Sequence, residues 1–207
     1  MKIKRVLIVI LALLAASVPA IRAAQAEPGV TSKPEAAVRN PRPGLMIFGR
    51  YGSFRPSSDI FKEVYGPGPV FSGEIRIRLI GGLHLSLEAG SFKKTGKLTV
   101  TKEATKMTIF PVEAMAIYHF LPGKITPYAG AGPHLVSYRE SNILGSVSGS
   151  GLGFAVCGGV AARWRFIGLD ARVKYASVKD TPVKDKVDFS GLTFDIALGL
   201  FLGRSLN

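Results

Sequence analysis

Apolar and polar residues alternate with a period of two along most of the chain. Residues 70–80 are the clearest case, because Ile77 and Leu79 fall on one face while Arg76 and Arg78 fall on the other. This period is that of a β-strand, since a helix would spread the charges around its circumference. Eight such segments predict an all-β fold with strands over 45–54, 70–80, 83–94, 106–120, 126–138, 152–164, 167–177 and 189–202.

The connections between these segments alternate in length. Short turns at one end and long loops at the other are typical of an up-and-down transmembrane barrel, and eight strands place both termini on the short-turn side. Residues 58–65 favour a short helical turn, and the Gly/Ser-rich residues 145–151 favour a flexible loop tip. The expected short turns are 81–82, 121–124 and 165–166, and the expected long loops are 55–69, 95–105, 139–151 and 178–188.

The N-terminus has the features of a cleaved signal peptide over residues 1–26. A basic start precedes an apolar run from Val6 to Ala16, and the small-residue site Ala24-Gln25-Ala26 follows. An uncleaved membrane anchor is the alternative, but the apolar run is short for a spanning helix. The domains expected after it are a flexible, proline-rich periplasmic lead over 27–43, an outer-membrane β-barrel over 44–202 and a short C-terminal tail over 203–207.

Composition narrows the class of protein. Apolar residues make up 47% of the 207 residues, which argues against disorder. The net charge is +13, of which four positive charges lie in residues 1–26, so the remaining chain carries +9. The basic residues are not interleaved with aromatic residues at a spacing suited to a nucleic acid, so we expect no nucleic-acid partner. Apart from the N-terminal apolar run, no stretch of the chain approaches a transmembrane helix. After residue 26 the chain can therefore cross a bilayer only as a closed barrel, because every backbone polar group must be paired there.

The polar face of the strands carries both acids and bases. Near-balance of sign suits a narrow barrel interior, since a buried charge without a partner is costly. An eight-stranded barrel is just wide enough for side chains to fill it. We therefore expect a plugged interior with an ion-pair network of Arg50, Glu74, Arg76, Arg78, Glu88, Glu113, Arg163, Asp170, Arg172, Lys174 and Asp195.

Aromatic residues cluster near the strand ends, where girdles at the membrane interfaces would lie. The alternative is that aromatic residues simply favour strands. The group beside the short turns is Tyr118, Phe120, Tyr128, Trp164 and Phe166, and the group beside the long loops is Phe54, Phe92, Tyr138 and Phe189.

Three segments give the chain a resemblance to the outer-membrane protein β-barrel domain family, the small eight-stranded barrels similar to the OmpA transmembrane domain and to OmpW- and OmpX-like proteins. They are residues 126–132, 151–154 and 168–175. The resemblance covers roughly residues 44–202. It implies a monomeric barrel in the cell outer membrane, with outer-membrane lipid, lipopolysaccharide and the barrel assembly machinery as partners. Members of the family often end on an aromatic residue that the assembly machinery recognises. This chain departs from that pattern, since Phe201 is followed by six further residues.

An enzyme is the first alternative, because some barrels of this size resemble lipid A acyl hydrolases. His84, Ser86 and Glu88 share one strand face, which suggests a nucleophile with a base and a carboxylate. They lie at the periplasmic end, however, whereas lipid A lies in the outer leaflet. A polar inward row is the simpler interpretation, and we expect no catalytic residues.

A soluble, lipocalin-like periplasmic carrier is the second alternative, and it would turn the apolar faces inward.

The single cysteine, Cys157, excludes an intramolecular disulfide. His119 and His134 lie on separate strands, so we expect no cofactor and no metal site. The function that fits best is an integral outer-membrane protein of structural or interaction type.

Overall fold

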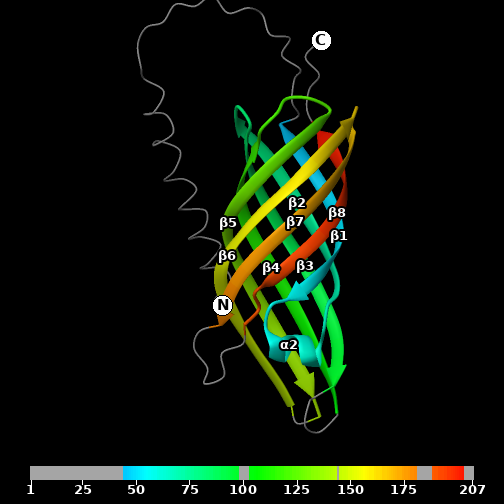
Figure 1. The fold of residues 1–207 in the computed structure, drawn as a ribbon, viewed down its shortest axis with the longest axis vertical. Helices are drawn as coiled ribbons and strands as arrows, with labels where there is room; N and C mark the ends of the chain where they lie inside the picture. Colours follow the sequence, from blue (N-terminus) through cyan, green and yellow to red (C-terminus); the bar gives the residue numbers. More distant parts are fainter. Residues whose placement is uncertain (1–43, 98–102, 144, 181–187, 203–207) are drawn as a thin grey trace, which may run out of the picture. The chain divides into compact units, whose positions relative to one another are not determined.

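The computed structural model describes residues 44–97, 103–143, 145–180 and 188–202. Within them the chain forms eight strands and one short helix, in a single closed barrel (Figure 1). The predicted eight-stranded antiparallel barrel is confirmed. The elements are β1 (Leu45–Pro56), α2 (Asp59–Val64), β2 (Gly68–Ile80), β3 (Leu83–Lys97), β4 (Ala104–His119), β5 (Ile125–Asn142), β6 (Gly145–Trp164), β7 (Ile167–Asp180) and β8 (Gly191–Leu202).

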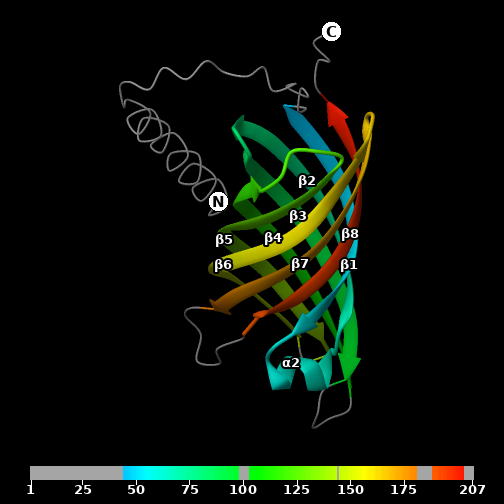
Figure 2. The same ribbon diagram turned by 45° about the horizontal axis from the view of Figure 1, so that its top comes forward.

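Each strand pairs with its neighbours in sequence, and β1 pairs with β8 to close the barrel. The closing pair runs antiparallel from Leu45 opposite Leu202 to Pro56 opposite Gly191. In Figures 1 and 2 the start of β1 (blue) and the end of β8 (red) lie at one end of the barrel, and α2 lies at the other. Among the described residues, no helix is long and apolar enough to span a bilayer.

The alternating residues separate onto the two faces of the barrel wall. On β2, Arg76 is 0% exposed, whereas its neighbours Ile75 and Ile77 are 45% and 41% exposed on the outside. The same alternation holds along β8, where Asp195 points inward between outward Phe194 and Ile196. Apolar side chains therefore cover the outside of the barrel, and charged side chains lie within it. This arrangement is opposite to the one that a lipocalin-like carrier needs.

The short turns lie where the sequence predicts them. Gly81, with a φ of 55°, lies in the turn between β2 and β3, and Arg165, with a φ of 54°, lies in the turn between β6 and β7. The predicted helical turn in the first long loop is α2, whose first turn is capped by the Ser58 hydroxyl accepting from the Phe61 backbone N–H. The signal peptide, the periplasmic lead and the C-terminal tail lie outside the described residues.

The long loop expected over 139–151 is wrong. Strand β5 continues to Asn142 and β6 begins at Gly145, so this segment is a tight hairpin, paired without interruption from Asn142 opposite Gly145 to Val136 opposite Gly151. The glycines that suggest a flexible loop permit the pairing. A Cβ on Gly149 would lie 2.7 Å from the Tyr138 hydroxyl, so only glycine leaves room for the tyrosine on the neighbouring strand.

Candidate functional site

The middle of the barrel interior holds a network of buried ion pairs. Arg50 of β1 lies at its centre. Its guanidinium contacts the carboxylates of Glu74 at 2.5 Å, Asp170 at 2.8 Å and Asp195 at 2.7 Å. These acids come from β2, β7 and β8, so one arginine joins strands on both sides of its own.

Arg172 of β7 joins a second group of acids. Its guanidinium lies 2.7 Å from Glu88 of β3 and 2.9 Å from Asp195 of β8. Lys174, two residues along β7, contacts Glu88 at 3.4 Å and also pairs with Glu113 of β4. Strands β3 and β7 are not neighbours, so these contacts cross the interior of the barrel.

Arg76 completes the network on the side of the short turns. Its Nε donates to Glu74 at 2.8 Å, and its guanidinium lies over the rings of Phe48 at 5.0 Å and Tyr128 at 4.8 Å. The Tyr128 hydroxyl donates to Asp170 at 2.8 Å. The aromatic faces and the carboxylates together replace the water that this arginine would otherwise need.

The structure brings nine of the eleven predicted interior charges together and leaves out Arg78 and Arg163. Arg78 lies near the end of β2 and donates to the backbone oxygen of Gly81 at 3.2 Å in an exposed contact. The Arg163 guanidinium lies 5.8 Å from the ring of Phe201. Both occupy inward positions, but they lie close to the barrel end, where the side chain reaches solvent and needs no carboxylate.

His134 is the member of the network that the sequence did not reveal. Its Nδ1 lies 3.4 Å from Glu113. Ser72 was also missed, and it donates to Glu88 at 2.7 Å. Ser86, which the sequence places in an inward polar row, donates to Glu74 at 2.6 Å. Alternation places all three residues inward, but only closure of the barrel shows which acid each one meets.

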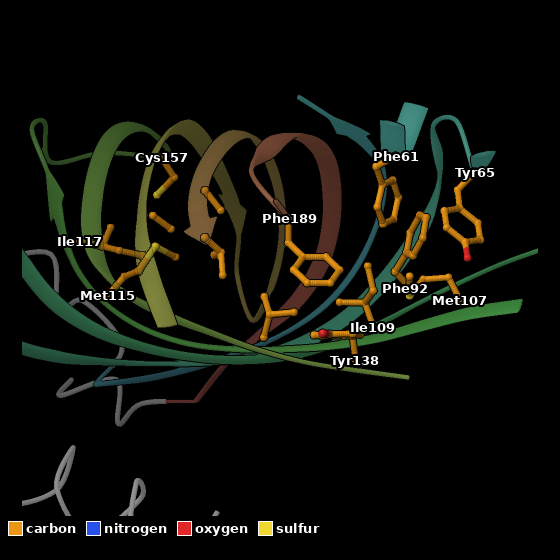
Figure 3. Close-up of a cluster of buried hydrophobic side chains, with 14 of the residues drawn as sticks. Phe61, Tyr65, Phe92, Met107, Ile109, Met115, Ile117, Tyr138, Cys157 and Phe189 are labelled. Carbon is orange, nitrogen blue, oxygen red and sulfur yellow. The ribbon is translucent and has the colours of Figure 1, made fainter. Parts of the chain in front are cut away.

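Apolar layers lie on both sides of the charged network. Towards the strand ends near the termini, Met46, Phe48 and Ala197 form a buried cluster against Phe201. At the opposite end, α2 covers the barrel, and Phe61 from this helix packs against Phe92 and Phe189 with ring centroids 6.3 and 6.1 Å apart. Figure 3 shows these three rings gathered inside the barrel wall, away from Met115, Ile117 and Cys157.

The predicted girdle beside the long loops is wrong. Phe92, Tyr138 and Phe189 are buried and point inward, where they form the apolar layer under α2. Phe54 packs against the same layer. The cause is side-chain alternation, because Phe92 and Tyr138 fall on the charged face of their strands, and Phe189, which lies between β7 and β8, is buried with them.

Beside the short turns, the aromatic residues divide between the two faces. Tyr118, Phe120, Trp164 and Phe166 are exposed on the outside, as a girdle would be. Tyr128 is the exception, because it is buried against Arg76 and Asp170. A position near a strand end identifies candidate girdle residues. Only those whose side chains lie on the outward face of the strand can belong to the girdle.

The geometry of His84, Ser86 and Glu88 does not favour a catalytic site. Ser86 is 0% exposed, and its hydroxyl donates to Glu74. His84 Nδ1 lies 2.9 Å from the backbone oxygen of Gly82. A buried hydroxyl that already donates to a carboxylate is not available to an acyl substrate. Within the described part of the chain, no group of three or more histidine, cysteine or acidic side chains is placed to hold a metal ion.

Comparison with solved structures finds this architecture among outer-membrane proteins. The crystal structure of Neisserial surface protein A is 21% identical, covers 77% of this chain and 97% of its own, and superposes with a TM-score of 0.58. Ail, the attachment invasion locus protein of Yersinia pestis, solved with the heparin analogue sucrose octasulfate, is 15% identical, covers 75% of this chain and 96% of its own, and has a TM-score of 0.50. No protein-family model and no curated protein sequence matches the chain. The chain has the closed eight-stranded antiparallel barrel fold of these small outer-membrane proteins.

Proposed function

We propose that this chain is an integral outer-membrane protein of structural or interaction type, with a closed lumen. One observation carries the proposal, namely the inverted burial of the barrel wall. Arg76 is 0% exposed at the centre, while Leu169 and Leu198 are each 62% exposed on the outside. Water would not stabilise such a surface, whereas hydrocarbon would, because exposed apolar patches of this extent mark a membrane or a partner.

Three layers support a closed lumen. The cluster of Met46 and Phe48 lies at one end, the ion-pair network lies in the middle, and the aromatic layer under α2 lies at the other end. The cavity between the aromatic layer and the network has a volume of about 50 Å³. Such a space holds one or a few water molecules, which supports a closed lumen.

The remaining parts of the proposal follow from the sequence. A signal peptide over residues 1–26 would export the chain, and the barrel assembly machinery would insert it as a monomer among outer-membrane lipid and lipopolysaccharide. The end with the short turns would face the periplasm, and the long hairpins with α2 would face outward. Contacts with other molecules would then be made by these hairpins, because a closed lumen would offer no binding site of its own.

The single tryptophan provides a direct test of membrane placement. Trp164 is 81% exposed on the outside of the barrel, next to the turn between β6 and β7. In vesicles, its fluorescence should be quenched more strongly by lipids brominated near the head group than by lipids brominated at the chain ends, because a girdle residue lies at the interface. The folded chain should also require detergent for extraction and change its gel mobility on boiling. Equal weak quenching by both lipids, with extraction into buffer, would contradict the proposal.

A further inference from the structure

The outward faces of β3, β4 and β5 carry a cluster of cations just beyond the apolar belt. Lys93 and Lys97 lie on β3, Lys106 lies on β4 and Arg139 lies on β5, and all four side chains are exposed. These positions alternate with buried ones along each strand, so the four cations share one face of the sheet. We refer to these four residues as the basic patch.

The register brings the members of the basic patch together. Thr108 pairs with Lys93 on one side and with Arg139 on the other. Lys106 lies two residues from Thr108 and pairs with Thr95, so it is the diagonal neighbour of Lys93, Lys97 and Arg139. Diagonal neighbours on one sheet face lie roughly 7–8 Å apart, which is within reach of long side chains that converge on one anionic group.

Acidic residues do not neutralise this face. Among the described residues, the outward positions of β3, β4 and β5 beyond Phe110 carry only basic, hydroxyl and alanine side chains. Glu140 points to the other side of β5, where it accepts from Tyr65 at 2.5 Å and from Thr105 at 2.8 Å. Glu103 precedes β4 and is half-buried. The next strand adds hydroxyl groups, since Ser148 pairs with Arg139.

An open apolar groove on the outside of the barrel adjoins the basic patch. It has a volume of about 1120 Å³, its lining runs over β1–β4 and β6–β8, and Ser91 and Phe110 lie at the end nearest the patch. Ser91 is two residues from Lys93 on the same face of β3, and Phe110 is two residues from Thr108 on β4. The groove passes over Gly73, where an added Cβ would meet no atom within 4 Å. The cations and the groove therefore form one continuous amphipathic surface.

We propose that this surface binds a lipid with a phosphorylated head group, with the phosphate on the basic patch and an acyl chain in the groove. Charge complementarity selects an anionic head group, and the adjoining groove selects an acylated molecule over a soluble polyanion. The proposal rests on the proposed function, because it requires that the long hairpins lie at the outer leaflet. Lys106 is the central contact, because each of the other three cations is its diagonal neighbour.

The test measures binding of diphosphorylated lipid A to the folded chain in neutral detergent micelles by native mass spectrometry. The variant K93Q/K106Q should lower the affinity about tenfold or more, since each lysine near an anionic surface contributes on the order of 1 kcal/mol. The control K62Q/K124Q removes the same charge from exposed lysines outside the patch and should change the affinity less than about twofold. The variant K93R/K106R should retain binding, and Gly73→Leu, which fills the groove, should weaken it.

Three outcomes would overturn the lipid site. They are equal loss in the two double glutamine variants, binding of unphosphorylated lipid A as tightly as the phosphorylated form, and binding of the deacylated head group as tightly as the intact lipid. The last result would assign the patch to a soluble anion. Unboiled gel mobility is recorded for every sample. A folded barrel that fails to bind counts against this site alone, whereas a chain that needs no detergent counts against membrane placement.

Discussion

At the scale of single residues, the interior charges depend on one another. Arg172 contacts Glu88 and Asp195, and all three side chains are buried. The low dielectric of this region makes each pairing strong and each loss expensive, since removal of one partner leaves the other charged and without water. The stability of the barrel should therefore respond much more to removal of a central arginine than to removal of one near the rim.

Replacement of Arg172 by Met should lower the free energy of unfolding by about 3–5 kcal/mol, because Glu88 and Asp195 lose their shared cation. The control is Arg78→Met, which removes an exposed contact with Gly81 and should cost about 0.5 kcal/mol or less. Urea unfolding in vesicles, followed by the change in gel mobility, measures both variants. Equal effects at the two arginines would show that the network does not support the fold.

Tyr65, which directly follows α2, gives a prediction about pH. Burial and the hydrogen bond to Glu140 raise the pKa of the Tyr65 hydroxyl. In the unfolded chain the tyrosine hydroxyl has a pKa of about 10, so the folded state keeps this proton to a higher pH than the unfolded chain does. The stability that the neutral hydroxyl provides is complete below about pH 10 and decreases as the pH rises from there.

The variant Tyr65→Phe should therefore be less stable than the wild type at neutral pH, and the difference should shrink above about pH 10. Urea midpoints measured for both proteins from neutral to strongly alkaline pH give this difference directly. A gap that is constant across the range would show that the hydroxyl does not titrate with folding.

Alternation in the sequence identifies which charges point inward, because a strand has only two faces. It cannot identify their partners. Arg76 and Arg78 lie on the same face of β2, yet only Arg76 meets carboxylates, since it lies deeper in the barrel. His134 shows the same limit, because its neighbour Glu113 is chosen by the pairing of β4 with β5.

At the scale of elements, composition gives a wrong prediction where pairing with a neighbouring strand determines the structure. Glycine and serine in 145–151 suggest a loop, but a paired neighbour strand supplies the hydrogen bonds that the isolated segment lacks. Helix α2 was predicted correctly because its signals are local. Ser58 caps the helix, and Phe61 faces the apolar layer three residues later.

Replacement of Gly149 by Val should loosen the hairpin of β5 and β6, because the new side chain would occupy the space of the Tyr138 ring. The control is Ser148→Val, an outward position on the same strand with the same added side chain. Hydrogen exchange of the backbone amides in the hairpin should rise for the first variant and stay unchanged for the second. The same protection in both would contradict a close-packed hairpin.

At the scale of the whole molecule, the three interior layers predict that the barrel does not conduct. Purified protein in a planar bilayer should produce no stable current steps. The double variant F61A/F189A removes part of the aromatic layer but leaves the ion-pair network and the layer around Phe48 in place. It should also remain closed, and regular steps from the wild-type protein would show an open lumen.

The pairs that cross the barrel have a consequence for how the chain assembles. Arg50 meets Asp170 and Asp195 only after β1 joins β8, because these residues are 120 and 145 positions apart in the chain. In an open sheet, Arg50 would still meet Glu74 of adjacent β2 and Asp195 would still meet Arg172 of adjacent β7, but Asp170 would lack both of its arginines, Arg50 and Arg76. Pairing of β1 with β8 is therefore the step that completes the interior network, and a sheet that has not closed leaves Asp170 as a carboxylate without its cations.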